Sequence, residues 1–159
     1  MNNKMFGPYS LRNLRPKSAK VAEDGFTATL LRNGHAVAQV DCGFDALEDD
    51  DREADDLVVE FLTQTEMDFF KTSVIQLGRG PETDTPRDER FLRDLAEHTY
   101  HCQRLAALCK HNTVFRTPTD PPGHWRQIRA PYRPALESAI RRRYQGTQLE
   151  FANHMGAGM

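Results

Sequence analysis

The sequence predicts an α+β fold in which an antiparallel sheet, built from two β-hairpins, carries helices packed on one face. Three observations support this prediction: an Asn-Gly dipeptide between two strand-like segments near the N-terminus, a long central region with apolar residues at helical spacing, and two short strand-like segments in the last third of the chain. Because the strand-like segments come in neighbouring pairs and do not alternate with helices, we expect the sheet to be antiparallel.

The first hairpin has the clearest local signal in the chain. Apolar and polar side chains alternate over residues 26–30, Asn33-Gly34 follows, and a second apolar segment covers residues 37–40. Both residues of an Asn-Gly pair tolerate positive φ, as the type I′ turn of a two-residue hairpin loop requires. These features predict two antiparallel strands joined at Asn33-Gly34.

The domain organisation follows from length and from the segments outside this pattern. Residues 1–18 contain Gly7, Pro8 and Pro16 without any periodicity, which predicts an irregular N-terminal arm. A chain of 159 residues suffices for one hydrophobic core, so we expect a single α+β domain over residues 19–155. Residues 156–159 are predicted to be a frayed tail.

The central region is predicted to be helical. The acidic segment 45–56 leads into apolar residues that suit one side of a helix, among them Leu57 and Phe61, and the spacing of Phe70 and Val74 continues the helical pattern. After a loop rich in Gly and Pro, a long amphipathic helix is predicted over residues 86–110.

The last third should return to strands and end in helices. Residues 113–117 and 125–129 are predicted to be short strands joined by a turn-rich segment, and Pro134 suits the first turn of a helix that Gly146 would end. Thr147 and Glu150 have the spacing of a capping box, which predicts a short final helix.

The charges are distributed unevenly along the chain. The net charge is −2, yet residues 1–20 carry five basic and no acidic side chains, whereas residues 21–70 carry fourteen acidic against two basic ones. No apolar segment approaches the roughly 18 residues of a membrane span, and no secretory signal pattern is visible. Three irregularly spaced cysteines fit reduced thiols. We therefore expect a cytoplasmic protein.

Several short motifs lie in about half of the chain. They are the first hairpin, the segment CKHNTVFR at residues 109–116, GHWR at residues 123–126 and PYRP at residues 131–134. Together they resemble a group of small uncharacterised proteins carried by bacterial phages and plasmids. Where that group has a Gly-Gly-Cys turn after the hairpin, this chain has Asp41-Cys42-Gly43-Phe44. The resemblance implies an accessory protein of a mobile element inside a bacterial host, a class that often inhibits host defence, but it implies no activity and no site.

The first functional hypothesis is a non-enzymatic protein that binds a basic surface of a host protein through an acidic face. Such a face could imitate a phosphate backbone and occupy the basic groove of a nucleic-acid-handling protein. An alternative is that these carboxylates only keep the chain soluble or meet its own basic segments. The candidate partner-binding residues are Asp45, Glu48, Asp49, Asp50, Asp51, Glu53, Asp55 and Asp56.

The second hypothesis is nucleic-acid binding by the C-terminal segment. Arginine pairs with phosphates and aromatic rings stack on bases, although a single tryptophan is more often part of a core and cations near a helix C-terminus are favourable without a ligand. The candidate residues are Arg116, Trp125, Arg126, Arg129, Tyr132, Arg133, Arg141, Arg142 and Arg143.

A third hypothesis is a zinc site. His98 and Cys102 are one helical turn apart, but Cys109 lies too far along the same helix to join them, so no tetrahedral ligand set exists locally. Packing of these side chains is the favoured interpretation. Since the chain also lacks a nucleophile elbow and a phosphate-binding glycine loop, we expect no enzyme activity, no cofactor and no metal.

Overall fold

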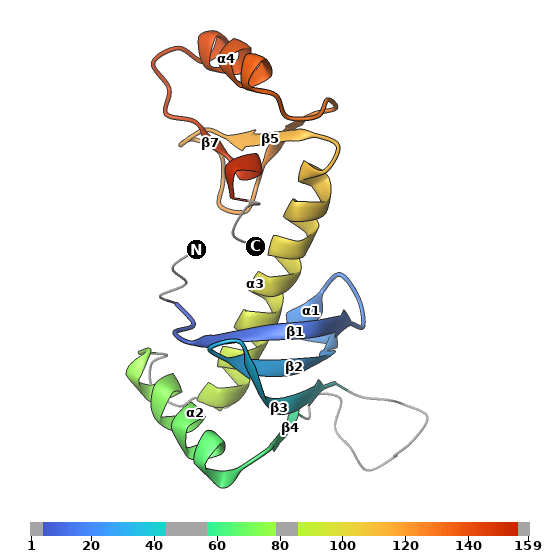
Figure 1. The fold of residues 1–159 in the computed structure, drawn as a ribbon, viewed down its shortest axis with the longest axis vertical. Coiled ribbons are helices and arrows are strands. Elements are labelled where there is room, and N and C mark those ends of the chain that lie inside the picture. Colours follow the sequence, from blue (N-terminus) through green and yellow to red (C-terminus); the bar gives the residue numbers. More distant parts are fainter. Residues whose placement is uncertain (1–4, 44–56, 79–85, 156–159) are drawn as a thin grey trace. The chain divides into compact units, whose positions relative to one another are not determined.

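The computed structural model describes residues 5–43, 57–78 and 86–155, and it confirms the α+β class. The chain divides into two compact units, residues 2–100 and residues 101–159, and each has a hydrophobic cluster of its own. The two predicted hairpins contribute to two different sheets, one in each unit (Figure 1). This differs from the single domain that the chain length suggested.

The unit of residues 2–100 is built on a four-stranded antiparallel sheet with the strand order β1-β2-β3-β4. Asn33 and Gly34 both have positive φ, and they join β2 to β3 as the sequence predicts. The strands are β1 (Tyr9–Pro16), β2 (Phe26–Arg32), β3 (His35–Cys42) and β4 (Leu57–Phe61), with a short helix α1 (Val21–Asp24) between β1 and β2.

The prediction of an irregular arm at residues 1–18 is wrong where β1 forms. Tyr9 and Leu11 are buried, and β1 pairs with β2 from Tyr9 opposite Arg32 onward. The register then shifts between Arg12 and Arg15 at Asn13, which has a positive φ of 56°. This bulge breaks the two-residue alternation after four residues, so the sequence pattern does not reveal the strand.

The prediction of a helix beginning near residue 54 is also wrong within the described residues, because residues 57–61 form strand β4. Leu57, Val59 and Phe61 stand opposite Cys42, Val40 and Ala38 of β3. Two adjacent valines favour a strand over a helix. Helix α2 (Gln64–Gln76) begins only after Thr63, whose hydroxyl accepts a hydrogen bond from the Glu66 backbone N–H.

Two helices pack on one face of this sheet. The long helix α3 (Arg87–Cys109) matches the predicted range closely, and its N-terminal half contributes Phe91, Leu92 and Leu95 to the core. Helix α2 contributes Phe70, whose ring meets that of Phe91 edge-on at 5.6 Å. Most side chains of β2, β3 and β4 on the opposite face are polar, among them Thr27, Gln39 and Glu60, as is common for antiparallel sheets with one solvated face.

The unit of residues 101–159 contains a three-stranded sheet with the order β6-β5-β7. The predicted strands and the helix at Pro134 are confirmed as β5 (Thr113–Arg116), β6 (Arg126–Ile128) and α4 (Pro134–Arg143). The predicted final helix is wrong, since Glu150 and Phe151 form strand β7 (Glu150–Phe151), which pairs with β5, and only a 3₁₀ turn, η1 (Ala152–His154), follows. Burial of Phe151 against Phe115 outweighs the local capping-box signal.

Across the described ranges, no helix combines the length and the apolar character that crossing a bilayer requires.

The backbone at Gly25 yields the first prediction. Its φ is +100°, and a Cβ at this position would lie 2.2 Å from the carbonyl oxygen of Cys42. Gly34 also has a positive φ, but a Cβ there would meet nothing within 4 Å. Gly34→Ala should therefore destabilise the protein by about 1–2 kcal/mol through backbone strain alone, and Gly25→Ala by clearly more, because the sheet must also move. Urea unfolding followed by circular dichroism measures both, and equal losses would contradict the close contact.

Candidate nucleic-acid interface

The eight carboxylates of the predicted acidic face, Asp45 to Asp56, lie outside the described residues, so that hypothesis stays a prediction. The nine residues of the predicted nucleic-acid set all belong to the unit of residues 101–159, within the described part. The geometry of this unit separates them into four groups.

The sheet register distributes these side chains over two faces. Phe115 on β5 stands opposite both Phe151 of β7 and Arg126 of β6, and its ring meets Tyr144, just beyond α4, at 5.6 Å. Helix α4 therefore covers this face of the sheet. Since neighbouring residues of a strand point to opposite faces, Arg116 and Trp125 project from the other face.

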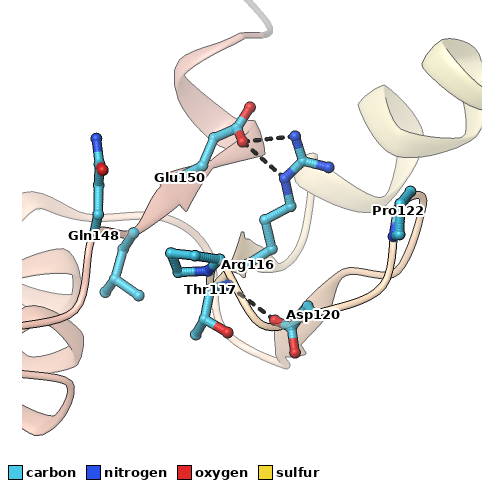
Figure 2. Close-up of a pocket in the computed structure, with 8 residues that line it drawn as sticks. Arg116, Thr117, Asp120, Pro122, Gln148 and Glu150 are labelled. Atoms are coloured by element: carbon cyan, nitrogen blue, oxygen red, sulfur yellow. Dashed lines mark hydrogen bonds and ion pairs between the residues drawn. The ribbon is translucent and has the colours of Figure 1, made fainter.

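On that other face, Arg116 lies between an acidic and an aromatic side chain. Its guanidinium carbon sits 4.6 Å from the centroid of the half-buried Trp125 ring. Its Nη2 lies 2.7 Å from Oε2 of Glu150, the ion pair that Figure 2 shows. The aliphatic part and charge of Arg116 thus hold the indole ring in place from one side. A hollow of about 620 Å³ adjoins the ion pair, lined by Thr117, Asp120 and Gln148 among others.

Arg126, on the α4 side, is neutralised by Asp120. The two side chains are joined by hydrogen bonds of 2.9–3.2 Å, and Arg126 also donates to the Tyr144 hydroxyl. These bonds from Arg126, followed by one from the Thr117 backbone N–H, lower the pKa of Asp120 from 3.8 to about 2, and the same pairing raises the pKa of Arg126. Arg126 is therefore a structural cation that closes the β5–β6 connection.

Arg141 and Tyr132 belong to a second internal cluster. Arg141 lies 3.7 Å from Glu137 and over the ring of Phe151, while Nε2 of His154 lies 2.6 Å from Glu137 and 3.0 Å from the Tyr132 hydroxyl. Burial, followed by the nearby Glu137 carboxylate, raises the pKa of Tyr132. Both predicted residues are thus engaged in packing this unit and are not free for a ligand.

The remaining four arginines of the predicted set have no ion pair with any described residue. Arg129 follows β6 directly, Arg133 occupies the N-cap position of α4, and Arg142 and Arg143 are the last two residues of that helix; all four are exposed. Residues 101–159 hold nine basic and only three acidic side chains. Since Asp120, Glu137 and Glu150 are each paired with an arginine, the excess of six positive charges lies on side chains that these carboxylates do not neutralise.

The structure also assigns roles that the sequence pattern did not indicate. The Asn153 side chain accepts a hydrogen bond from the Val114 backbone N–H and donates to the carbonyls of Cys109 and Asn112. It thereby ties the end of α3 to strand β5. A single asparagine near the C-terminus carries no periodicity or motif, so nothing in the sequence marks this role.

No group of three metal-ligating side chains occurs within the described ranges. Burial raises the pKa of the Cys102 and Cys109 thiols, which disfavours the thiolate form that a metal site or a nucleophile needs.

No protein-family model, no curated protein and no solved structure matches this chain. The function is therefore inferred from the site itself.

The Asp120–Arg126 pair predicts a pH dependence. Because the pKa of Asp120 is lowered to about 2 in the folded chain, the pair stabilises the unit above the ordinary carboxyl pKa of 3.8, and this contribution is lost as the pH falls toward 2. Asp120→Asn should lower stability at neutral pH and flatten this acid dependence. Trp125 is the only tryptophan and lies in this unit, so its fluorescence during urea unfolding reports the change. Parallel acid profiles of the variant and the original protein would contradict the pairing.

Proposed function

We propose that this chain is a non-enzymatic nucleic-acid-binding protein and that residues 101–159 make the contact. The observation that carries the proposal is the charge balance of this unit. Its three carboxylates are each matched to an arginine, which leaves Arg129, Arg133, Arg142 and Arg143 exposed without an ion pair in the described residues. Uncompensated arginines attract phosphates and gain affinity from the release of condensed counterions.

Fewer aromatic side chains are available for base stacking in this proposal than the sequence indicated. Tyr132 packs on Phe151 and bonds His154, so Trp125 is the one aromatic residue of the predicted set left to stack on a base. Arg116 covers one side of its ring and Glu150 holds Arg116, which pre-orders the indole before a ligand arrives. Stacking on an ordered ring loses less conformational entropy than stacking on a mobile one.

A local structural role competes with this proposal for part of the set. Arg142 and Arg143 lie at the C-terminus of α4, where cations stabilise the helix dipole without any ligand. The helix-dipole effect does not involve Arg129 or Trp125. Variants at Trp125 as well as at Arg142 and Arg143 therefore distinguish nucleic-acid binding from stabilisation of the helix.

The proposal is tested by removing two exposed arginines from each unit in turn. Arg142→Ala with Arg143→Ala should weaken binding of a fluorescently labelled oligonucleotide at low salt and reduce the slope of log affinity against log salt by roughly 1.4–1.8, the value for two lost phosphate contacts. Arg12→Ala with Arg15→Ala is the matched control, since both residues are exposed on β1 and form no ion pair in the described residues. Fluorescence anisotropy measures both double variants.

The control should bind as the original protein does. Equal losses in the two double variants would indicate nonspecific attraction to net charge, and the absence of binding to any single- or double-stranded probe at low salt would remove the proposal. Trp125→Ala should weaken the binding of single-stranded probes by roughly 1–3 kcal/mol if the ring stacks on a base.

A second candidate function is retained on one observation, the eight carboxylates within residues 45–56 with only Arg52 among them. In this second proposal the chain is an accessory protein of a phage or plasmid. It binds a basic host protein and thereby inhibits a nucleic-acid-handling or defence system. Steering by such a dense charge accelerates association.

For this candidate, lysine at Asp49, Asp50 and Asp51 should abolish capture of a host protein from a nuclease-treated bacterial lysate without unfolding the chain. The captured proteins are identified by mass spectrometry, and circular dichroism checks the fold. Capture that the triple substitution leaves unchanged would remove the acidic face from consideration.

A further inference from the structure

The two edges of the four-stranded sheet differ in how they are protected. Strand β1, at one edge, carries a bulge at Asn13, two exposed arginines and Pro16 at its end. Bulges, charges and proline are the devices that keep a free edge from pairing with another strand. Strand β4, at the opposite edge, pairs with β3 without any register shift and contains neither proline nor a bulge (Figure 1).

The side chains of β4 are also incompletely covered. Leu57, Val59 and Phe61 face the core side of the sheet but are only half-buried, whereas the core-facing residues of β2 and β3 are buried. Beside them lies a hollow of about 410 Å³, which is lined on one side by the apolar side chains of Met67 and Phe70 and on the other by charged residues, Lys71, Asp88 and Glu89. A hollow with an apolar side, next to a strand edge that no other described strand pairs, is the space that the next strand of a sheet would fill.

Alternate residues of β4 direct their backbone N–H and C=O groups away from β3, toward the edge of the sheet. The Leu62 N–H donates to the Val37 carbonyl of β3 at 2.9 Å. Since backbone groups alternate in direction along a strand, Glu60 and Val58 also bond toward β3, and the N–H and C=O groups of Leu57, Val59 and Phe61 point to the open edge. These three residues are therefore the ones that an added strand would hydrogen-bond.

We infer that β4 of a second copy of this chain occupies the edge, antiparallel and centred on a twofold axis at Val59. In this register Val59 meets Val59 of the copy and Leu57 meets Phe61, so each outward peptide group gains its partner and every core-facing pair is apolar. Glu60, the only charged residue of β4, stands opposite Val58 and not opposite another carboxylate. The sequence Leu-Val-Val-Glu-Phe is thus complementary to itself in shape, polarity and charge.

This self-complementarity is the reason to choose a second copy over an unrelated strand. In an isologous twofold contact the same strand of both copies meets, so the strand must be complementary to itself. A five-residue strand with apolar residues at its first, third and fifth positions meets this requirement. The resulting dimer would carry residues 101–159 twice, and two linked copies of a weak binding unit raise the apparent affinity for a polymer that both can reach. The dimer itself does not depend on the proposed function.

The inference is tested by measuring molar mass by light scattering during size-exclusion chromatography. The original protein should elute with twice the mass of its 18.2 kDa chain at high concentration and dissociate on dilution. Val59→Pro removes an N–H that points to the open edge and that β3 does not use, so it should give a folded monomer. Val59→Thr is the matched control, since it keeps both the N–H and the β-branched shape, and it should stay dimeric.

A second pair of variants keeps the inference testable if the proline variant does not fold. Val58 is 38% exposed on the opposite face of β4. Val58→Glu would place a carboxylate opposite Glu60 of the copy and weaken the dimer, and Val58→Lys would strengthen it; salt should reduce both changes. A monomeric original protein at its highest soluble concentration, or a dimer that Val59→Pro and Val58→Glu leave unchanged, would overturn the inference.

Discussion

The register of the β2–β3 hairpin is the constraint on which the unit of residues 2–100 depends. The Asn33-Gly34 turn, together with a register shift between Leu30 and Leu31, sets Phe26, Ala28 and Leu30 directly opposite Cys42, Val40 and Ala38, and all six are buried. A slip of one residue would turn every one of these side chains toward water. The outer strands continue the same rows, because Leu11 of β1 stands beside Leu30 and Val59 of β4 beside Val40. Helices α2 and α3 can cover one face only because the turn and this register shift together decide which face is apolar.

The parts of the fold that were predicted correctly are those whose signal is local. The Asn-Gly turn, the long apolar stripe of α3 and the proline that opens α4 each act within a few residues. The errors arise where distant contacts decide. Strand β1 is identified by its pairing with β2, β4 by its pairing with β3, and β7 by the burial of Phe151 against Phe115. Strand β1 is interrupted by a bulge, while β4 and β7 are short and follow an acidic flank and a capping motif that support another structure locally.

For the candidate site, too, the sequence predicts the composition but not which side chains pair with one another. The sequence indicates that the C-terminal segment is rich in arginine, but it does not indicate which arginines are neutralised. Asp120 pairs with a residue six positions away, whereas Glu150 reaches 34 positions back to Arg116. Only the fold separates Arg116, Arg126 and Arg141, which hold the unit together, from Arg129, Arg133, Arg142 and Arg143, which it leaves exposed. The tertiary structure therefore decides how many arginines of this segment are left to contact phosphates.

Asn153 has a consequence for how this chain can vary. Its amide oxygen accepts one backbone hydrogen bond while its amide nitrogen donates two, to carbonyls on either side of the α3–β5 junction. Aspartate has the same shape but no donors, and it would set a negative charge against two carbonyl oxygens. Serine is too short to reach both sides, and glutamine would set its amide one methylene further from the backbone. In any set of diverging sequences that keep this unit, asparagine at this position should be retained more strictly than the arginines around it, and it would serve as a marker of the fold where the charged surface has changed.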